Sequence, residues 1–176
     1  MTFKSENGRI ATVDATGVIK AVAAGKTRIT VTETATGISA SCTVNVTAKE
    51  GWKKESKGWM YQNADGSYPK DQWKAIESKW YHFDANGYMQ TGWLHLGSKW
   101  YYLKDNGEMV TGWLKLGNTW YYLKSNGEMT TGWLQIGNTW YYLKSSGAMA
   151  VNEWVDNGKS YVDANGKYVP GQKKYT

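Results

Sequence analysis

The side chains of this sequence that could do chemistry are aromatic, and they recur at a fixed interval. Gly-Trp pairs place Trp93, Trp113 and Trp133 20 residues apart, and a Trp-Tyr-Tyr-Leu run begins seven residues after each of them. The chain holds 11 Trp and 13 Tyr beside only 2 Phe. Because Trp and Tyr carry a polar tip that needs a partner or water, this aromatic content suits surfaces and grooves better than a dry interior.

Aromatic faces with no anionic group among them favour a quaternary ammonium ligand. Its charge is diffuse, it donates no hydrogen bond, and the π-faces attract it. Each cation–π contact contributes roughly 0.5 to 2 kcal/mol, so three rings give on the order of 2 to 5 kcal/mol. That energy corresponds to a roughly millimolar single site. Several such sites on one chain would raise the affinity for a polymer bearing many ligands by about 100-fold or more.

Acid–base and nucleophilic chemistry have little support in the sequence. His82 and His95 lie 13 residues apart in different repeats, and we expect surface or packing roles for both. Glu108 and Glu128 stand beside turns and recur with the repeat period instead of forming an acid–base pair. No Ser-His-Asp or metal-ligand spacing occurs, and the single Cys42, which we expect to be buried, offers no disulfide framework. The sequence predicts no enzyme, no cofactor and no metal site.

A β-hairpin is predicted to position each aromatic set. In the regular repeat, the two-residue turn signal Gly117-Asn118 separates the apolar runs 113–116 and 119–123. This turn pairs residue 116 with 119 and residue 113 with 122. Because side chains alternate between the two faces of a hairpin, one face carries Trp113, Lys115, Trp120 and Tyr122. The opposite face carries Leu114, Leu116, Tyr121 and Leu123.

Such a hairpin has two apolar faces and is marginal in water by itself. We therefore expect the hairpins to stack, with the Trp face of one against the Leu/Tyr face of the next. Trp113 and Trp120 would then meet Tyr141 of the following repeat, so that three rings wall one groove. The predicted fold class is all-β, a β-hairpin solenoid that follows a truncated Ig-like β-sandwich segment.

The first 48 residues differ from the rest in composition. They contain no Trp and no Tyr, and they hold β-branched segments separated by turn signals, at 10–14, 18–22, 27–32 and 39–46. We predict a domain boundary here, with a partial Ig-like domain at 1–48 and the repeat solenoid at 49–176. The runs Ile10–Asp14, Gly17–Gly25 and Cys42–Val46 resemble the C-terminal part of a bacterial Ig-like domain of group 2, whose opening strands would precede Thr2.

The aromatic repeat resembles the choline-binding, cell-wall-binding repeat of Gram-positive surface proteins and lytic enzymes. The resemblance rests on Gly112-Trp113, Trp120-Tyr-Tyr-Leu123, Asn126-Gly-Glu-Met129 and Thr131-Gly-Trp133, and it covers about 51 to 169. It implies a solenoid whose inter-repeat sites hold the choline of teichoic or lipoteichoic acid between two Trp and a Tyr. It also implies an extracellular, cell-wall-associated protein.

Carried over by position, the resemblance gives three ligand sites: Trp73/Trp80/Tyr101, Trp93/Trp100/Tyr121 and Trp113/Trp120/Tyr141. A fourth, Trp52/Trp59/Tyr81, requires that the insertion at 65–69 be tolerated. The pair Trp133/Trp140 meets Val162 where the Tyr should stand, so we expect that site to be weak or empty. Met residues would add a fourth wall, but the sequence does not decide which site each one joins: Met89, Met109, Met129 and Met149. Tyr102, Tyr122 and Tyr142 are expected to pack.

Two alternatives to choline binding stay open. The rings could stack on a cell-wall glycan or glucan, or they could form a packed core that binds nothing. A homodimer through the incomplete Ig-like segment or the solenoid end is also open.

Charge and hydropathy limit the partners. The 21 Lys and Arg residues exceed the 15 Asp and Glu by six but are scattered singly, and no nucleic-acid-binding signature accompanies them. No apolar run approaches the roughly 18 residues of a membrane span. Met1-Thr-Phe-Lys4 lacks the apolar region of a secretory signal, so the extracellular location follows from the resemblance alone.

Overall fold

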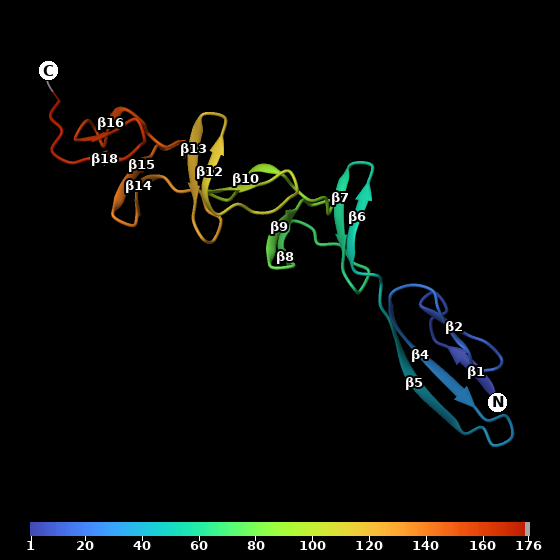
Figure 1. The fold of residues 1–176 in the computed structure, drawn as a ribbon. Helices are drawn as coiled ribbons and strands as arrows, with labels where there is room; N and C mark the ends of the chain where they lie inside the picture. The colour runs from blue at the N-terminus through green and yellow to red at the C-terminus, as the bar shows by residue number, and fades with distance from the viewer. Residues whose placement is uncertain (175–176) are drawn as a thin grey trace. The chain divides into compact units, whose positions relative to one another are not determined.

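The computed structural model describes residues 1–174, which form strands and turns and contain no helix. The predicted all-β hairpin fold is confirmed, and Figure 1 shows the succession of hairpins. The last two positions of the predicted solenoid, Tyr175 and Thr176, lie outside the described residues. Two compact units divide the chain, the first comprising Met1–Lys74 with His82–Met89 and the second comprising Ala75–Tyr81 with Gln90–Thr176.

The Ig-like part of the first unit consists of two small antiparallel sheets. One sheet has the order β1-β4-β5 and the other pairs β2 with β3, with the bounds β1 Thr2–Ser5, β2 Ala11–Val13, β3 Ile19–Ala21, β4 Gly25–Thr32 and β5 Ser39–Val46. Each segment predicted as a strand coincides or overlaps with one of β2 to β5. Strand β1 was not predicted, and it pairs with β4 from Thr2 opposite Thr32 to Ser5 opposite Ile29.

Cys42 corrects the expectation of a buried thiol, because it is exposed. It lies on β5, which is an edge strand of its sheet, and it lines an open groove together with Phe3 and Ile19. Its cross-strand partner Ile29, on the central strand β4, is buried instead. Apolar alternation identified the strand, but the number of neighbouring strands determined which side chain is covered.

The first unit also holds an aromatic hairpin of strands β6 (Gly51–Glu55) and β7 (Gly58–Gln62). Strands β8 (Gln72–Ile76) and β9 (Lys79–Phe83) have residues in both units.

Three regular hairpins follow in the second unit, with pairs β10 to β11, β12 to β13 and β14 to β15. Their bounds are β10 Gly92–Leu96, β11 Lys99–Leu103, β12 Gly112–Leu116, β13 Thr119–Leu123, β14 Gly132–Ile136 and β15 Thr139–Leu143. The predicted register is confirmed, since Leu116 faces Thr119 and Trp113 faces Tyr122. Gly117 has a φ of 58°, the left-handed value that the first position of a type II′ turn requires and that glycine adopts without steric cost.

Successive hairpins are joined through the segment that follows each second strand. The amide of Met129 donates to the carbonyl of Trp100 one hairpin earlier, at 2.7 Å, and the amide of Met149 does the same to Trp120. Within the repeat, Leu123 forms a bridge with Met129, and Leu123 is completely buried. Leu103 and Leu143 hold the same place in their repeats, so each regular hairpin contributes one completely buried Leu to the core.

The C-terminal end departs from the two-stranded pattern. It is a three-stranded sheet of β16 (Glu153–Val155), β17 (Ser160–Val162) and β18 (Tyr168–Val169) in that order. Ala150, Val155 and Val162 form a buried cluster there, and Trp133 and Tyr142 pack against it. This cluster covers the end of the repeat array.

Candidate functional site

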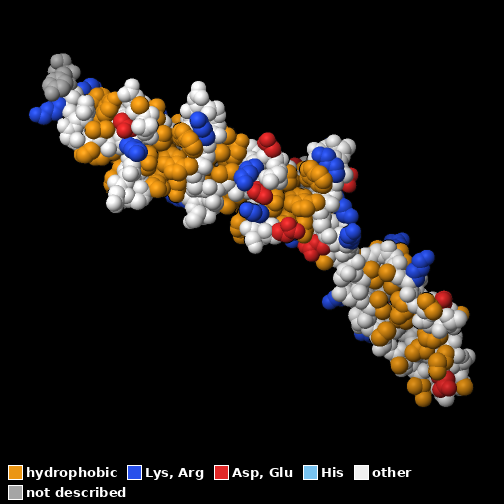
Figure 2. Space-filling view, viewed as in Figure 1, with side chains coloured by type: hydrophobic (Ala, Val, Ile, Leu, Met, Phe, Trp, Pro, Cys, Tyr) orange, Lys and Arg blue, Asp and Glu red, His pale blue; other side chains and the backbone are white. Residues whose placement is uncertain are grey.

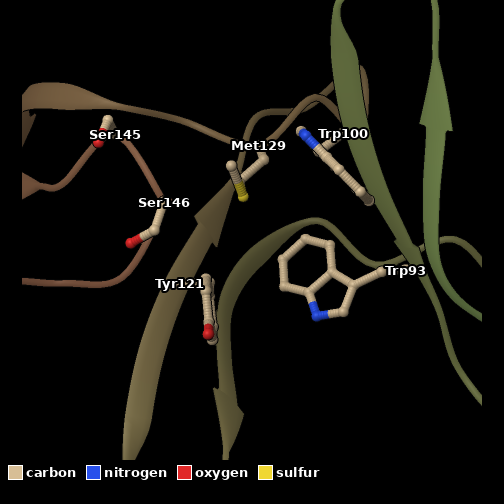
Figure 3. A pocket seen from close by; sticks show the side chains of 6 residues that line it. All are labelled: Trp93, Trp100, Tyr121, Met129, Ser145 and Ser146. Carbon is tan, nitrogen blue, oxygen red and sulfur yellow. The ribbon is translucent and has the colours of Figure 1, made fainter.

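A groove opens where the hairpin β10–β11 meets the next hairpin. Trp93 and Trp100 come from the first hairpin, Tyr121 comes from the second, and Met129 follows the second. Trp93 lies 6.2 Å from Trp100 and 4.9 Å from Tyr121 between ring centroids, with interplanar angles of 86° and 68°. Figure 3 shows these side chains around a common space, which measures about 350 Å³.

The same groove recurs one repeat further along the chain. Trp113, Trp120, Tyr141 and Met149 line a cavity of about 290 Å³. Trp113 lies 6.1 Å from Trp120 and 5.0 Å from Tyr141, at 85° and 73°. The structure therefore brings together the residues of two of the predicted sites, and it places a methionine in each. Whether these grooves bind a ligand is still a prediction.

The structure also shows which methionine lines which groove. Each groove receives the Met that lies eight residues after its Tyr, as Met129 does after Tyr121. The backbone fixes this choice, because the amide of Met129 is bonded to the carbonyl of Trp100 in the groove's own hairpin. Sequence spacing alone could not identify this bond.

A glycine of the following repeat lies against the methionine that lines the groove. A Cβ atom on Gly147 would lie 2.2 Å from the sulfur of Met129, and Gly147 has a φ of +83°. A larger side chain there would be strained by the backbone conformation and would have to displace the side chain of Met129. Gly127 and Met109 repeat this contact one repeat earlier.

The residues that line these two grooves carry no formal charge. Nearby charges are engaged with one another, as in the ion pairs Lys99–Glu128 at 3.6 Å and Lys144–Glu153 at 2.7 Å. The hydrogen bond from Lys104 lowers the pKa of the Glu108 carboxyl below its ordinary value. These carboxylates serve in local ion pairs and form no acid–base pair at a groove.

In the first two regular hairpins, the second Trp presents one of its faces to a cross-strand partner. His95 stacks on Trp100 at 4.4 Å, and the ammonium of Lys115 lies 5.6 Å from the ring centre of Trp120. Neither partner lines a groove. Trp100 and Trp120 are nevertheless exposed, and Figure 2 shows apolar side chains gathered on the surface of the hairpin region.

The tyrosines expected to pack do so. Tyr102, Tyr122 and Tyr142 each meet the first Trp of their own hairpin edge to face at 5.2 Å, and none of them lines one of the grooves described here. His82 is buried and meets Trp73 at 5.0 Å, so it has a packing role as expected.

The residues of the other two predicted sites are divided between the compact units. In the first unit, Trp52 packs on Tyr61 at 5.3 Å, and the exposed Trp59 has the ammonium of Lys54 5.2 Å from its ring centre. Trp73 is half-buried on β8.

In the second unit, Trp80 is exposed, Tyr101 is half-buried on β11, and burial raises the pKa of the Tyr81 hydroxyl. Trp73/Trp80/Tyr101 and Trp52/Trp59/Tyr81 thus stay predictions as sites.

Trp133 and Trp140 have a third ring that the repeat pattern did not identify, and whether this site is weak or empty stays a prediction. Tyr168 of β18 lies 5.4 Å from Trp133 at 81° and lines a cavity of about 410 Å³ with Trp133, Trp140 and Ser160. The alignment of Val162 with the Tyr is wrong, because Val162 pairs with Glu153 as the buried Leu143 pairs with Gly132. Ser160, opposite Val155, stands where Tyr141 stands opposite Leu134. The available signal in the sequence was that Tyr168 stands two residues after Gly166, as Met149 stands two residues after Gly147.

Across residues 1–174, no group of three or more His, Cys, Asp or Glu side chains is arranged to hold a metal ion. Within the same range, no helix has the length and apolarity needed to cross a bilayer.

Comparison with known families agrees with the geometry. The choline-binding repeat family matches residues 70–112 and 110–154, and the bacterial Ig-like domain (group 2) matches residues 1–44. The chain therefore belongs to the choline-binding repeat proteins and carries a group 2 Ig-like segment on the N-terminal side of its repeats.

Solved structures from Streptococcus pneumoniae are similar to this chain. One of them is choline binding protein F, crystallised in the presence of a tetrasaccharide-pentapeptide peptidoglycan analogue. It is 42% identical to this chain with a TM-score of 0.65, and the match covers 87% of this chain and 48% of choline binding protein F. CbpJ of strain TIGR4 has a TM-score of 0.65 and 33% identity, covering 94% of this chain and 64% of its own. A lysin of Pneumococcus phage Dp-1 is 46% identical over 43 residues, which are 23% of this chain and 14% of the lysin. The chain thus spans less than two thirds of each of these relatives.

Proposed function

We propose that this chain is a non-catalytic, multivalent cell-wall attachment module that binds the choline of teichoic or lipoteichoic acids. The observation that carries the proposal is the groove of two Trp rings, one Tyr ring and one Met thioether, which recurs with the same geometry in successive repeats. Four uncharged, polarisable walls without a fixed anion suit a trimethylammonium group.

Ring orientation favours an ammonium ligand over a sugar. The rings of Trp93, Trp100 and Tyr121 stand steeply to one another, at 68° and 86°, and so surround a compact, roughly spherical group. A sugar ring is flat and needs one broad face for stacking together with polar groups aimed at its hydroxyls. The polar residues that line the groove, Ser145 and Ser146, belong to the turn of the next repeat, opposite the indole rings in Figure 3.

Repetition serves attachment because each groove is weak. Three cation–π contacts give on the order of 2 to 5 kcal/mol, which corresponds to a roughly millimolar dissociation constant. A polymer that bears many choline groups engages several grooves at once, and each additional contact becomes intramolecular. The module would then stay on a choline-bearing surface while releasing free choline quickly.

The location and partners follow from this proposal. Choline-bearing wall polymers lie outside the cell, so the module acts extracellularly at the cell wall, and the Ig-like segment at 1–44 serves as a spacer. Any enzymatic or adhesive activity of a longer protein would reside in another part of it.

A titration of intrinsic Trp fluorescence with choline tests the proposal, with ethanolamine and a glucan oligosaccharide as parallel controls. The exposed ring faces of Trp100 and Trp120 make the emission sensitive to occupancy. Saturation by choline alone is the expected result. A response to the glucan alone would replace the proposal by carbohydrate recognition, and no response to any of the three would leave a packed aromatic core without a ligand.

A further inference from the structure

The groove at Trp133 and Trp140 is closed by a ring from outside the regular repeat. Trp133 and Trp140 stand 6.3 Å apart at 83°, which matches the pairs in the two preceding hairpins. Tyr168 then meets Trp133 at 5.4 Å and 81°. Its distance to the first Trp is only a few tenths of an ångström longer than that of Tyr121 or Tyr141.

Two substitutions relative to the regular repeat produce this arrangement together. Ser160 replaces the Tyr on the second strand of the final hairpin, because it pairs with Val155 as Tyr141 pairs with Leu134, and Tyr168 replaces the Met that follows the turn. Val162 is fully buried beside Ala150 and Val155 and therefore seals the end of the core. The aromatic wall has moved from the strand to the segment after the turn, where the regular repeat places a thioether.

The backbone fixes Tyr168 in this place. Tyr168 is opposite Val162 in the pairing of β17 with β18, and Lys167 forms a bridge with Tyr141 of β15. Strand β18 is thus attached both to the terminal sheet and to the hairpin that carries Trp140. A side chain held through its backbone on two sides loses little conformational freedom when a ligand binds.

We propose that Trp133, Trp140 and Tyr168 form a further quaternary ammonium site, built from a different set of positions than the regular grooves. The proposal rests on the proposed function, since it assigns the same class of ligand to a groove that the repeat pattern marks as defective. Three steeply inclined rings provide the cation–π contacts, and no charged side chain among residues 1–174 lines the groove.

The missing methionine sets this site apart. Tyr168 stands at its position, Ser160 lines the groove at the position of the regular Tyr, and the cavity of about 410 Å³ is larger than the 290 Å³ and 350 Å³ of the regular grooves. The ligand loses the dispersion contacts with one thioether while keeping all three rings. We therefore expect the site to bind choline about threefold to tenfold more weakly than the groove at Trp113.

The test uses the full chain labelled with 5-fluorotryptophan and followed by ¹⁹F NMR during a titration with choline chloride. The resonances of Trp100, Trp120 and Trp140 are assigned with single Trp→Phe variants. Saturable shifts of all three are expected, with the Trp140 curve displaced to higher choline concentration. If Trp100 and Trp120 respond while Trp140 does not, the terminal site is overturned and the proposed function stands. If none of the three responds, the proposed function itself fails.

Variants at Tyr168 distinguish the contribution of its aromatic ring to ligand binding from its contribution to the fold. Tyr168→Phe keeps the ring and should keep the Trp140 shift, whereas Tyr168→Leu keeps apolar bulk without the π-face and should abolish that shift. The resonance of Trp154, which lies on β16 of the same terminal sheet, reports whether the sheet survives each change. A Trp140 shift that persists undiminished in Tyr168→Leu would overturn the role of the ring.

A second variant keeps the proposal falsifiable if Tyr168→Leu disturbs the sheet. Trp140 is 42% exposed and lies on a regular hairpin, so Trp140→Ala should leave the fold intact. The number of choline molecules bound per chain, measured calorimetrically, is expected to fall by one. An unchanged number would show that this groove takes no ligand.

Discussion

The two tryptophans of a repeat have unequal surroundings and therefore unequal roles. Trp113 is half-buried and contacts Tyr122, Trp120 and Tyr141, so it belongs both to the hairpin and to the groove. Trp120 is 37% exposed, and the side chain that it meets across the strand pair is Lys115. The exposed ring serves the ligand more than the fold.

Alanine substitutions should separate these roles. Trp120→Ala is expected to remove one choline site while lowering the free energy of unfolding by about 1 kcal/mol, the order of one cation–π contact. Trp113→Ala should remove the same site and cost about 3 kcal/mol, because it leaves a cavity between two hairpins. Calorimetric stoichiometry and urea unfolding measure the two quantities. Equal stability losses in both variants would contradict this division.

At the level of single residues, the sequence predicted the aromatic rings of a groove better than it predicted the contacts that depend on neighbouring hairpins and strands. The rings Trp113, Trp120 and Tyr141 could be assigned to one groove because strand alternation and a 20-residue period place them there. The partner of Met129 depends on a backbone hydrogen bond between hairpins, and the role of Tyr168 depends on a third strand. Both are long-range features that no local pattern encodes.

At the scale of the element, the turn glycine after each hairpin connects backbone conformation to the groove of the preceding repeat. Gly147→Ala forces a Cβ into a left-handed position and against the sulfur of Met129. We expect it to lower the free energy of unfolding by more than about 1 kcal/mol and to weaken choline binding at the groove of Trp93. Site-resolved fluorescence or ¹⁹F titrations measure the second effect.

Gly137→Ala provides the matched control. Gly137 also has a positive φ, of +58°, but no atom lies within 4 Å of its ideal Cβ position. This variant should therefore lose stability through strain alone and keep the affinity of every groove. If Gly147→Ala and Gly137→Ala affect ligand binding alike, the contact with Met129 does not position the groove.

The turn at 104–108 should give the stability a small dependence on pH. The hydrogen bond from Lys104 lowers the pKa of Glu108 in the folded chain, so this carboxylate stabilises the fold above its ordinary pKa of 4.5. That contribution is lost as the pH falls through the lower folded value. The midpoint temperature of unfolding should fall less steeply on acidification in Glu108→Gln than in the parent chain, and Lys104→Met should behave similarly. If the midpoint temperature falls as steeply with decreasing pH in both variants as in the parent chain, the pair contributes nothing measurable to stability.

Regular hairpins were the elements that the sequence predicted best. Gly117-Asn118 between two apolar runs determines both the turn and the register, so the pairing of Trp113 with Tyr122 followed directly. Strand β1 and the exposure of Cys42 were missed because they depend on which strand lies beside β4 and β5. Local alternation predicts a strand and its faces but contains no information about its neighbours.

At the scale of the whole molecule, attachment depends on how many grooves act on one polymer. The two regular grooves and the terminal groove recur at successive hairpins of the second compact unit. A domain boundary near residue 48 remains a prediction from composition. The binding strength of the module is therefore a property of the array, whereas specificity is a property of one groove.

This distinction predicts different responses to free and immobilised ligand. Tyr121→Ala and Tyr141→Ala should each remove about one bound choline per chain, and the double variant about two. On a surface that bears many choline groups, each lost groove removes an intramolecular contact, so the dissociation rate should rise by about tenfold or more per substitution. Surface plasmon resonance on choline-coated and ethanolamine-coated chips measures this dissociation rate. The variants Tyr121→Phe and Tyr141→Phe, which keep the rings, are the controls. A dissociation rate that rises only in proportion to the number of grooves lost would mean that the grooves bind the surface one at a time.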